Sequence, residues 1–166
     1  MYIEKIKSPA DLKKLDLKAL QTVADETRQA VLNRVSKHGG HVGPNLGLVV
    51  ATVALHYVFD APKDKLVFDV SHQSYPHKVL TGRAAGFLGN VDDMNAISGY
   101  SSPTECPEYD NFEVGHTSTS ISLATGLQKA RDIKGTHENI IAIIGDGSLS
   151  GGEAFEGLDE ASELDT

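Results

Sequence analysis

The stretch Ile140-Ile141-Ala142-Ile143-Ile144-Gly145-Asp146-Gly147-Ser148 decides the class of fold. Its apolar half is mostly isoleucine, which predicts an interior strand of a parallel sheet with both faces covered. Gly145 and Gly147 then allow a tight turn, and residues 153–164 have the composition of a following helix. A buried strand that leads through a glycine turn into a helix predicts an α/β fold.

Asp146 lies in this turn, and its carboxylate is the kind of hard oxygen ligand that Mg²⁺ prefers. The free N–H groups at the start of a helix bind anions, so the turn predicts a site for a diphosphate held with Mg²⁺. The dinucleotide spacing G-x-G-x-x-G fails because position 150 is Ser150, and the chain has no G-x-x-x-x-G-K-[ST] loop. Taken alone, Gly-Asp-Gly is equally compatible with a plain turn that carries an exposed acid.

The length, net charge, cysteine count and apolar runs of the chain limit the kinds of protein that it can be. The chain has 166 residues, for which we expect a single domain over 1–166, and its formal net charge is −8. That charge argues against nucleic acid and against an anionic membrane as partners. Cys106 has no second cysteine to pair with, which favours a reducing, cytoplasmic location. The longest apolar run, 46–59, is too short to span a bilayer, and the N-terminus lacks a secretory signal.

Hydrophobic periodicity predicts alternating helices and strands. We expect helices that pack around a doubly wound, mostly parallel sheet with helices on both faces, and an irregular loop at 95–111. Two strands are too few to complete such a sheet, so we expect the gene product to be longer than this chain. The predicted helices are 17–35 (capped by Asp16, stopped by Gly39), 46–59 (capped by Asn45), 77–80 and 117–133 (stopped by Gly135), and the strands are 66–70 and 140–144.

Four histidines lie beside glycine, proline or hydroxyl residues at predicted element ends: His41, His72, His77 and His116. Ligands of open α/β sheets bind outside the carboxyl ends of the strands, where we expect His72, His116 and Asp146. Imidazole changes charge near neutral pH, which suits proton transfer. Each histidine alone is also compatible with a capping or surface role. A zinc site of His72, His77 and His116 is a weaker alternative, because Pro76 interrupts the segment.

The hydroxyl run Thr117-Ser118-Thr119-Ser120 stands at a predicted helix start. It offers hydroxyl and N–H groups to an anion, and an ordinary N-cap needs only one such residue. We assign His38, His56 and His137 to the surface or the core.

Four blocks together are similar to a known family: 39–47 (GGHVGPNLG), 68–78 (FDVSHQSYPHK), 114–122 (VGHTSTSIS) and 145–149 (GDGSL). They resemble the 1-deoxy-D-xylulose-5-phosphate synthases, which are thiamine-diphosphate-dependent relatives of transketolase. The resemblance implies the N-terminal part of a homodimeric transferase. Such an enzyme condenses pyruvate with glyceraldehyde 3-phosphate and releases CO₂, with thiamine diphosphate as the electron sink.

Carried over by position, the resemblance implies that Asp146 binds Mg²⁺ and that Gly147 and Ser148 lie against the diphosphate. His72 and the stretch Gly115-His116-Thr117 would line the cofactor site, and His41 would face the substrate for proton transfer or carbonyl polarisation. His77 and Lys78 would have supporting roles.

The family's second Mg²⁺ ligand, an Asn, and its cofactor-activating Glu would lie beyond residue 166, so we expect this chain alone to be inactive. Pro44, Val50 and Asp159 depart from the family pattern, as does the loop 97–111, and these changes bear on the acceptor aldehyde. Three alternatives remain: a transketolase-like enzyme with another donor and acceptor, a non-catalytic paralogue, and a zinc hydrolase.

Overall fold

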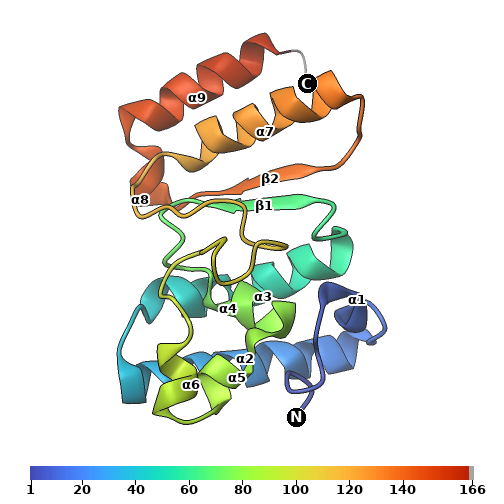
Figure 1. Cartoon of the computed structure of the whole chain (residues 1–166), viewed down its shortest axis with the longest axis vertical. Coiled ribbons are helices and arrows are strands. Elements are labelled where there is room, and N and C mark those ends of the chain that lie inside the picture. The colour runs from blue at the N-terminus through green and yellow to red at the C-terminus, as the bar shows by residue number, and fades with distance from the viewer. Residues whose placement is uncertain (165–166) are drawn as a thin grey trace. The chain divides into compact units, whose positions relative to one another are not determined.

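The computed structural model describes residues 1–164 and divides the chain into two compact units (Figure 1). The first unit comprises Met1–Ala61 and His72–Gly99, and the second comprises Pro62–Ser71 and the residues from Tyr100 onward. The chain therefore leaves the first unit for a short segment, returns to it, and leaves again. Asp165 and Thr166, where the predicted domain 1–166 ends, lie outside the described residues.

The first unit is helical, and its longest helix has the ends that the sequence predicts. The Asp16 side chain accepts a hydrogen bond from the Ala19 N–H at 2.8 Å, and Gly39 ends the helix at a φ of 83°. The two caps confirm the predicted limits, although the helix continues three residues past 35. The helices are α1 (Pro9–Leu12), α2 (Leu17–His38), α3 (Gly43–Val58), α4 (Tyr75–Lys78), the π-helix η1 (Val79–Arg83), α5 (Ala85–Leu88) and α6 (Val91–Asn95).

Two predicted helix starts in this unit are wrong. Helix α3 begins at Gly43, with Pro44 in its first turn, so Asn45 lies inside the helix and is not its cap. Asn45 is instead fully buried and bonds to backbone groups of neighbouring segments, because the Gly-Pro pair had already started the helix. The helix predicted at 77–80 begins two residues earlier, at Tyr75, and its helical backbone is broken by a kink at Thr81 and Gly82, where φ is −107° and 88°.

Arg34 organises the polar interior of the first unit. Its guanidinium group is 1% exposed and donates to the carbonyl oxygens of Gly86 (3.1 Å), Met94 (2.6 Å) and Ile97 (2.8 Å). It also lies over the rings of Tyr75 and Phe87, at 5.6 and 5.4 Å from the centroids. A planar fork of N–H donors suits this task, because it reaches three carbonyl groups at once.

The second unit contains a parallel two-stranded sheet. Strand β1 (Lys65–Phe68) pairs with β2 (Ile140–Ile143) in the register Lys65↔Ile140 to Phe68↔Ile143. The parallel pairing and the strand at 140 confirm the predicted α/β class, in an incomplete form. The sequence predicts that β2 is an interior strand with both faces covered. Within residues 1–164 this is not found, because the side chains of β2 are half-buried and β1 is its one strand partner.

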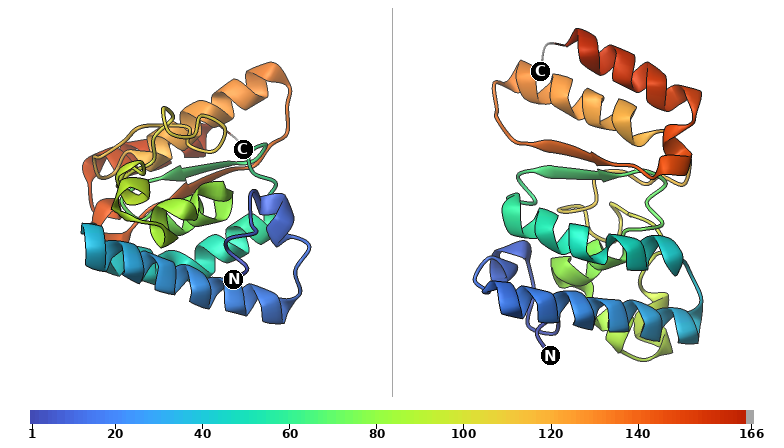
Figure 2. Two further views of the ribbon diagram at one scale, coloured as in Figure 1. Left: turned by 60° about the horizontal axis from the view of Figure 1, so that its bottom comes forward. Right: turned by 180° about the vertical axis from the view of Figure 1, so that it is seen from behind.

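Three helices follow in this unit: α7 (Ser120–Lys134), α8 (Asp146–Leu149) and α9 (Gly152–Glu163). Helix α7 packs on both strands, and α9 lies alongside α7 (Figure 1; Figure 2, right). Their close approach needs Gly157, since a Cβ there would lie 2.9 Å from the Ser122 hydroxyl oxygen. Gly135 ends α7 in the left-handed conformation, as predicted, and the irregular loop extends over 96–119.

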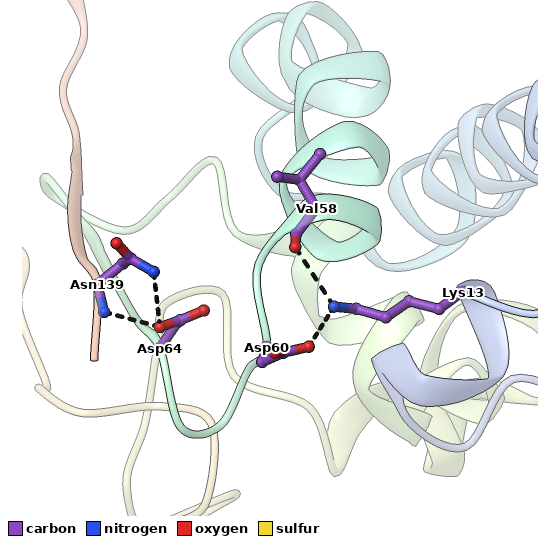
Figure 3. A network of polar contacts seen from close by, with 5 residues as sticks. All are labelled: Lys13, Val58, Asp60, Asp64 and Asn139. Carbon is purple, nitrogen blue, oxygen red and sulfur yellow. Dashed lines mark hydrogen bonds and ion pairs between the residues drawn. The ribbon is translucent and has the colours of Figure 1, made fainter. Parts of the chain in front are cut away.

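Figure 3 shows two polar networks, one in each unit. In the second unit, Asp64 accepts from the backbone N–H (2.7 Å) and the side-chain amide (3.1 Å) of Asn139, which joins the starts of β1 and β2. In the first unit, Lys13 donates to the Val58 carbonyl oxygen at 3.4 Å and to the Asp60 carboxylate, which holds the end of α3.

No helix within residues 1–164 has both the length and the apolar character needed to cross a lipid bilayer.

We predict that Arg34→Met lowers the free energy of unfolding by about 3 kcal/mol, because three carbonyl groups, two of them on buried residues, lose their donor. Urea denaturation followed by circular dichroism measures the change. Arg28→Met is the matched control on the same helix, where the arginine forms only a surface pair with Asp25 at 3.4 Å. It should change the unfolding free energy by less than about 0.5 kcal/mol. Equal effects of the two substitutions would contradict the role of Arg34.

Candidate functional site

Asp69 follows the last residue of β1 and is the central acid of the second unit. Its carboxylate is 1% exposed and accepts hydrogen bonds from the backbone N–H groups of Ser118 (3.0 Å) and Ser120 (2.9 Å). We expected these N–H groups to bind an external anion. That expectation is corrected for Ser118 and Ser120, because an internal carboxylate already occupies both donors.

The surroundings of Asp69 favour its ionised form. Burial alone would raise the pKa of this carboxyl, but hydrogen bonds from Ser120, Ser148 and Ser118 outweigh burial and lower the pKa below its usual value. The buried negative charge is therefore stable at neutral pH, and it fixes the start of α7 at the end of β1.

Ser118 joins the start of α7 to the turn at α8. It adopts a positive φ of 72°, and its hydroxyl donates to the Ser148 carbonyl oxygen at 2.6 Å. A Cβ at Gly151 would lie 1.9 Å from the Ser118 hydroxyl oxygen, so only glycine fits there. Gly151 lies one residue beyond the third glycine position of a dinucleotide loop, and this contact explains why a glycine is needed there.

Asp146 is exposed and is the first residue of α8. Its Oδ1 accepts a hydrogen bond from the Gly147 N–H at 2.9 Å, and a Cβ added to Gly145 or Gly147 would meet no atom within 4 Å. The turn is therefore open around a carboxylate, which fits one ligand of a bound cation. The helix predicted at 153–164 is confirmed as α9, which runs from Gly152 to Glu163, and the short helix α8 lies between it and β2.

The other predicted cofactor residues of this unit lie near these two turns. Gly115, His116 and Thr117 are exposed in the loop before α7, and Ser148 is half-buried in α8. The His116 carbonyl oxygen accepts from the Thr119 hydroxyl at 3.2 Å. The prediction that His116 follows the carboxyl end of a strand is wrong, because residues 96–119 form no strand.

In the first unit, His41 and His72 lie together. Both are half-buried, and their rings meet edge to face with centroids 5.1 Å apart and planes at 75°. The buried Asn45 amide donates to the carbonyl oxygens of both histidines at 2.8 Å, and its Oδ1 accepts from the Tyr75 N–H at 2.9 Å. One side chain inside α3 therefore holds two histidine-bearing segments and the start of α4.

His77 forms a separate pair with His56. Both are buried, with His77 Nδ1 and His56 Nε2 at 2.9 Å and rings stacked at 5.0 Å. Burial lowers the pKa of His56 well below its ordinary value, and the nearby charges of His77, Arg83 and Lys13 lower it further. His56, assigned from the sequence to the surface or the core, is buried.

The zinc alternative finds no support in the part of the chain that the structure describes. Residues 1–164 contain no group of three or more His, Cys, Asp and Glu side chains able to hold a metal ion. The structure brings together His41 and His72 in the first unit, and it places His116 and Asp146 in the second. A complete Mg²⁺ site would need ligands besides Asp146.

Three residues that organise these sites were missed or misassigned from the sequence. In the sequence, Asp69 and Tyr75 stand out only as parts of motifs, and Asn45 is predicted to be a helix cap. The signal for Asn45 was the preceding Gly-Pro pair, which is typical of a helix start one turn earlier.

Comparison with known proteins gives a consistent result. The profile of the family described as 1-deoxy-D-xylulose-5-phosphate synthase matches residues 3–166. A protein of that name from Dictyoglomus turgidum is 50% identical over 166 residues, which is all of this chain and 26% of the relative. The relative from Caldanaerobacter subterraneus is 51% identical over 94% of this chain and 25% of its own length. A chloroplastic relative, 1-deoxy-D-xylulose-5-phosphate synthase 1 of Oryza sativa, is 48% identical over 99% of this chain and 22% of its own length. The chain thus spans about a quarter of the length of these relatives.

We predict that Asp69→Asn lowers the free energy of unfolding at pH 7 by about 2 kcal/mol, because an NH₂ group, which can only donate, replaces one of the two oxygens that accept from backbone N–H groups. The folded-state pKa of Asp69 is lowered, so its contribution is fully present above the usual aspartate pKa. This contribution is lost as the pH falls through the folded-state pKa. The difference in unfolding free energy between wild type and Asp69→Asn should therefore shrink below about pH 4. Urea denaturation at a series of pH values measures it.

Asp146→Asn is the matched control for Asp69→Asn in the same unit. Its exposed carboxylate should change the unfolding free energy by less than about 0.5 kcal/mol. A difference between wild type and Asp69→Asn that does not vary with pH would contradict the ionised state of Asp69.

Proposed function

This chain belongs to the 1-deoxy-D-xylulose-5-phosphate synthase family, and from that premise we propose that it forms the N-terminal, cofactor-binding part of a thiamine-diphosphate-dependent transferase. The proposed reaction condenses pyruvate with glyceraldehyde 3-phosphate and releases CO₂. The observation that carries the proposal is the 50% identity over all 166 residues to a relative of that name. We also propose that residues 1–166 form a single domain and that the full-length enzyme is a homodimer.

We propose Asp146 as a ligand of Mg²⁺, with Gly147 and Ser148 against the diphosphate of the cofactor. Support comes from the exposed carboxylate at the carboxyl end of β2 and from the open turn at Gly145 and Gly147. Bound thiamine diphosphate would supply the electron sink for removing CO₂ from pyruvate. The protein then has to hold that cofactor, orient the substrates and handle protons.

The proposed proton chemistry rests on the histidines. His72 and the stretch Gly115-His116-Thr117 are proposed to line the cofactor site. His41 is proposed to face the substrate, where imidazole can donate or accept a proton near neutral pH. The Asn45 amide supports this role, because it holds the backbone of both His41 and His72. His77 and Lys78 are buried, which suits the supporting role proposed for them.

A cytoplasmic location and the absence of nucleic-acid and membrane partners remain part of the proposal. The charge of −8 and the unpaired Cys106 support them, while one of the plant relatives is a chloroplastic protein.

We predict that the full-length protein carrying this chain, supplied with Mg²⁺ and thiamine diphosphate, consumes pyruvate only when glyceraldehyde 3-phosphate is present as acceptor. Coupled assays of CO₂ release and product formation measure this. A ketose phosphate offered as donor in place of pyruvate should give no product. Turnover with the ketose phosphate and none with pyruvate would identify a transketolase-like enzyme instead. Residues 1–166 alone should show no turnover.

We predict that Asp146→Asn in the full-length protein weakens Mg²⁺-dependent binding of thiamine diphosphate by at least about tenfold, because a charged ligand of the cation is lost. Isothermal titration calorimetry with and without Mg²⁺ measures the affinity. The control is Asp132→Asn, since Asp132 is exposed in the last turn of α7 and pairs with Arg131. Unchanged binding in Asp146→Asn would refute the proposed ligand.

A further inference from the structure

The hydroxyl group of Tyr75 is buried against His41. Tyr75 is 1% exposed, and its hydroxyl oxygen lies 3.4 Å from the His41 backbone nitrogen and 3.5 Å from His41 Nδ1. The two rings are tilted by 57°, with centroids 6.2 Å apart. One phenol group therefore contacts both the backbone and the ring of the same histidine.

The chain next to His41 is shaped to admit this hydroxyl. Gly40 has a φ of 124°, which side chains rarely allow, and a Cβ there would lie 2.5 Å from the Tyr75 hydroxyl oxygen. The backbone nitrogen of Tyr75 is in turn held by Asn45 at 2.9 Å. Glycine at 40 and asparagine at 45 thus fix both ends of Tyr75 relative to His41.

Counting hydrogens determines the direction of these bonds. The His41 backbone N–H can only donate, so the hydroxyl oxygen accepts from it. The hydroxyl has one hydrogen of its own, and within residues 1–164 its remaining hydrogen-bond partner is His41 Nδ1. A buried hydroxyl hydrogen without an acceptor is unfavourable, so the hydroxyl donates to Nδ1.

We infer that Tyr75 is a positioning residue that holds neutral His41 as the tautomer with its hydrogen on Nε2. A ring nitrogen that accepts a hydrogen bond carries no hydrogen, so the other nitrogen must carry it. In this form His41 presents an N–H donor at Nε2, which suits polarisation of a carbonyl oxygen rather than removal of a proton. The effect on catalysis rests on the proposed role of His41 toward the substrate. The assignment of the tautomer rests on the contacts of Tyr75 alone.

The test is ¹⁵N nuclear magnetic resonance of the full chain, labelled at the histidine imidazoles, at about pH 8.5, where an ordinary imidazole is neutral. The His41 signals are assigned by comparison with His41→Asn. In wild-type protein, Nε2 should carry the hydrogen and Nδ1 should show the shift of an accepted hydrogen bond. In Tyr75→Phe, the Nδ1 signal should move to the position of a non-bonded nitrogen. Tyr57→Phe, which removes a partly exposed hydroxyl on α3, should leave both signals unchanged.

Hydrogen on Nδ1 in the wild-type protein would overturn the inference, and this measurement does not require the Tyr75→Phe variant to fold. An Nδ1 signal that is the same in wild type and Tyr75→Phe would also overturn it. In the full-length enzyme, Tyr75→Phe should lower kcat about tenfold and change the KM for pyruvate less than about twofold. If wild-type protein does not turn over pyruvate, the proposed function fails, and the tautomer measurement still decides this inference.

Discussion

The second unit depends on the buried carboxylate of Asp69. It stands at the end of β1 and accepts hydrogen bonds from the first N–H groups of α7, so it ties two elements that are distant in the sequence. Burying an ion is unfavourable unless its oxygens are bonded, and here the backbone N–H groups of Ser118 and Ser120 meet that demand. The open turn at Asp146 is positioned through the same contacts, because Ser118 bonds to the Ser148 carbonyl oxygen from its position beside Asp69.

In the first unit, the side chains that hold irregular segments are one neutral donor and one cationic donor. Asn45 holds the backbone of His41 and His72, and Arg34 holds three carbonyl groups of the segment 86–97. Each is a single side chain inside a long helix that fixes an irregular segment by its backbone. Because main-chain groups are held, the side chains of those segments remain available for chemistry. Two of the aspartates in the second unit differ in the same respect: Asp69 is buried and structural, and Asp146 is exposed and open to a ligand.

Local sequence signals predicted much of this arrangement. Asp16, Gly39 and Gly135 defined helix ends correctly, and the isoleucine run predicted β2, because these signals act within a few residues. Long-range polar contacts could not be predicted this way. The partner of the Ser118 and Ser120 N–H groups is Asp69, about 50 residues earlier, and no local pattern distinguishes it from an external anion. For Asn45 the preceding Gly-Pro pair was a local signal that it lies inside the helix, but its bonds to His72 and Tyr75 on another segment could not be predicted. The roles of the site residues toward the cofactor came from family resemblance and stay predictions.

The free edge of β2 has a practical consequence for handling this chain in isolation. Within residues 1–164, strand Ile140–Ile143 has a neighbour on one side, and its other edge has no strand partner. An isoleucine-rich edge with unpaired main-chain groups is a template for edge-to-edge pairing between molecules. Self-association in concentrated solutions of this segment would therefore originate at residues 140–143. A charged residue introduced on the solvent-facing side of that strand is the natural way to improve its solubility.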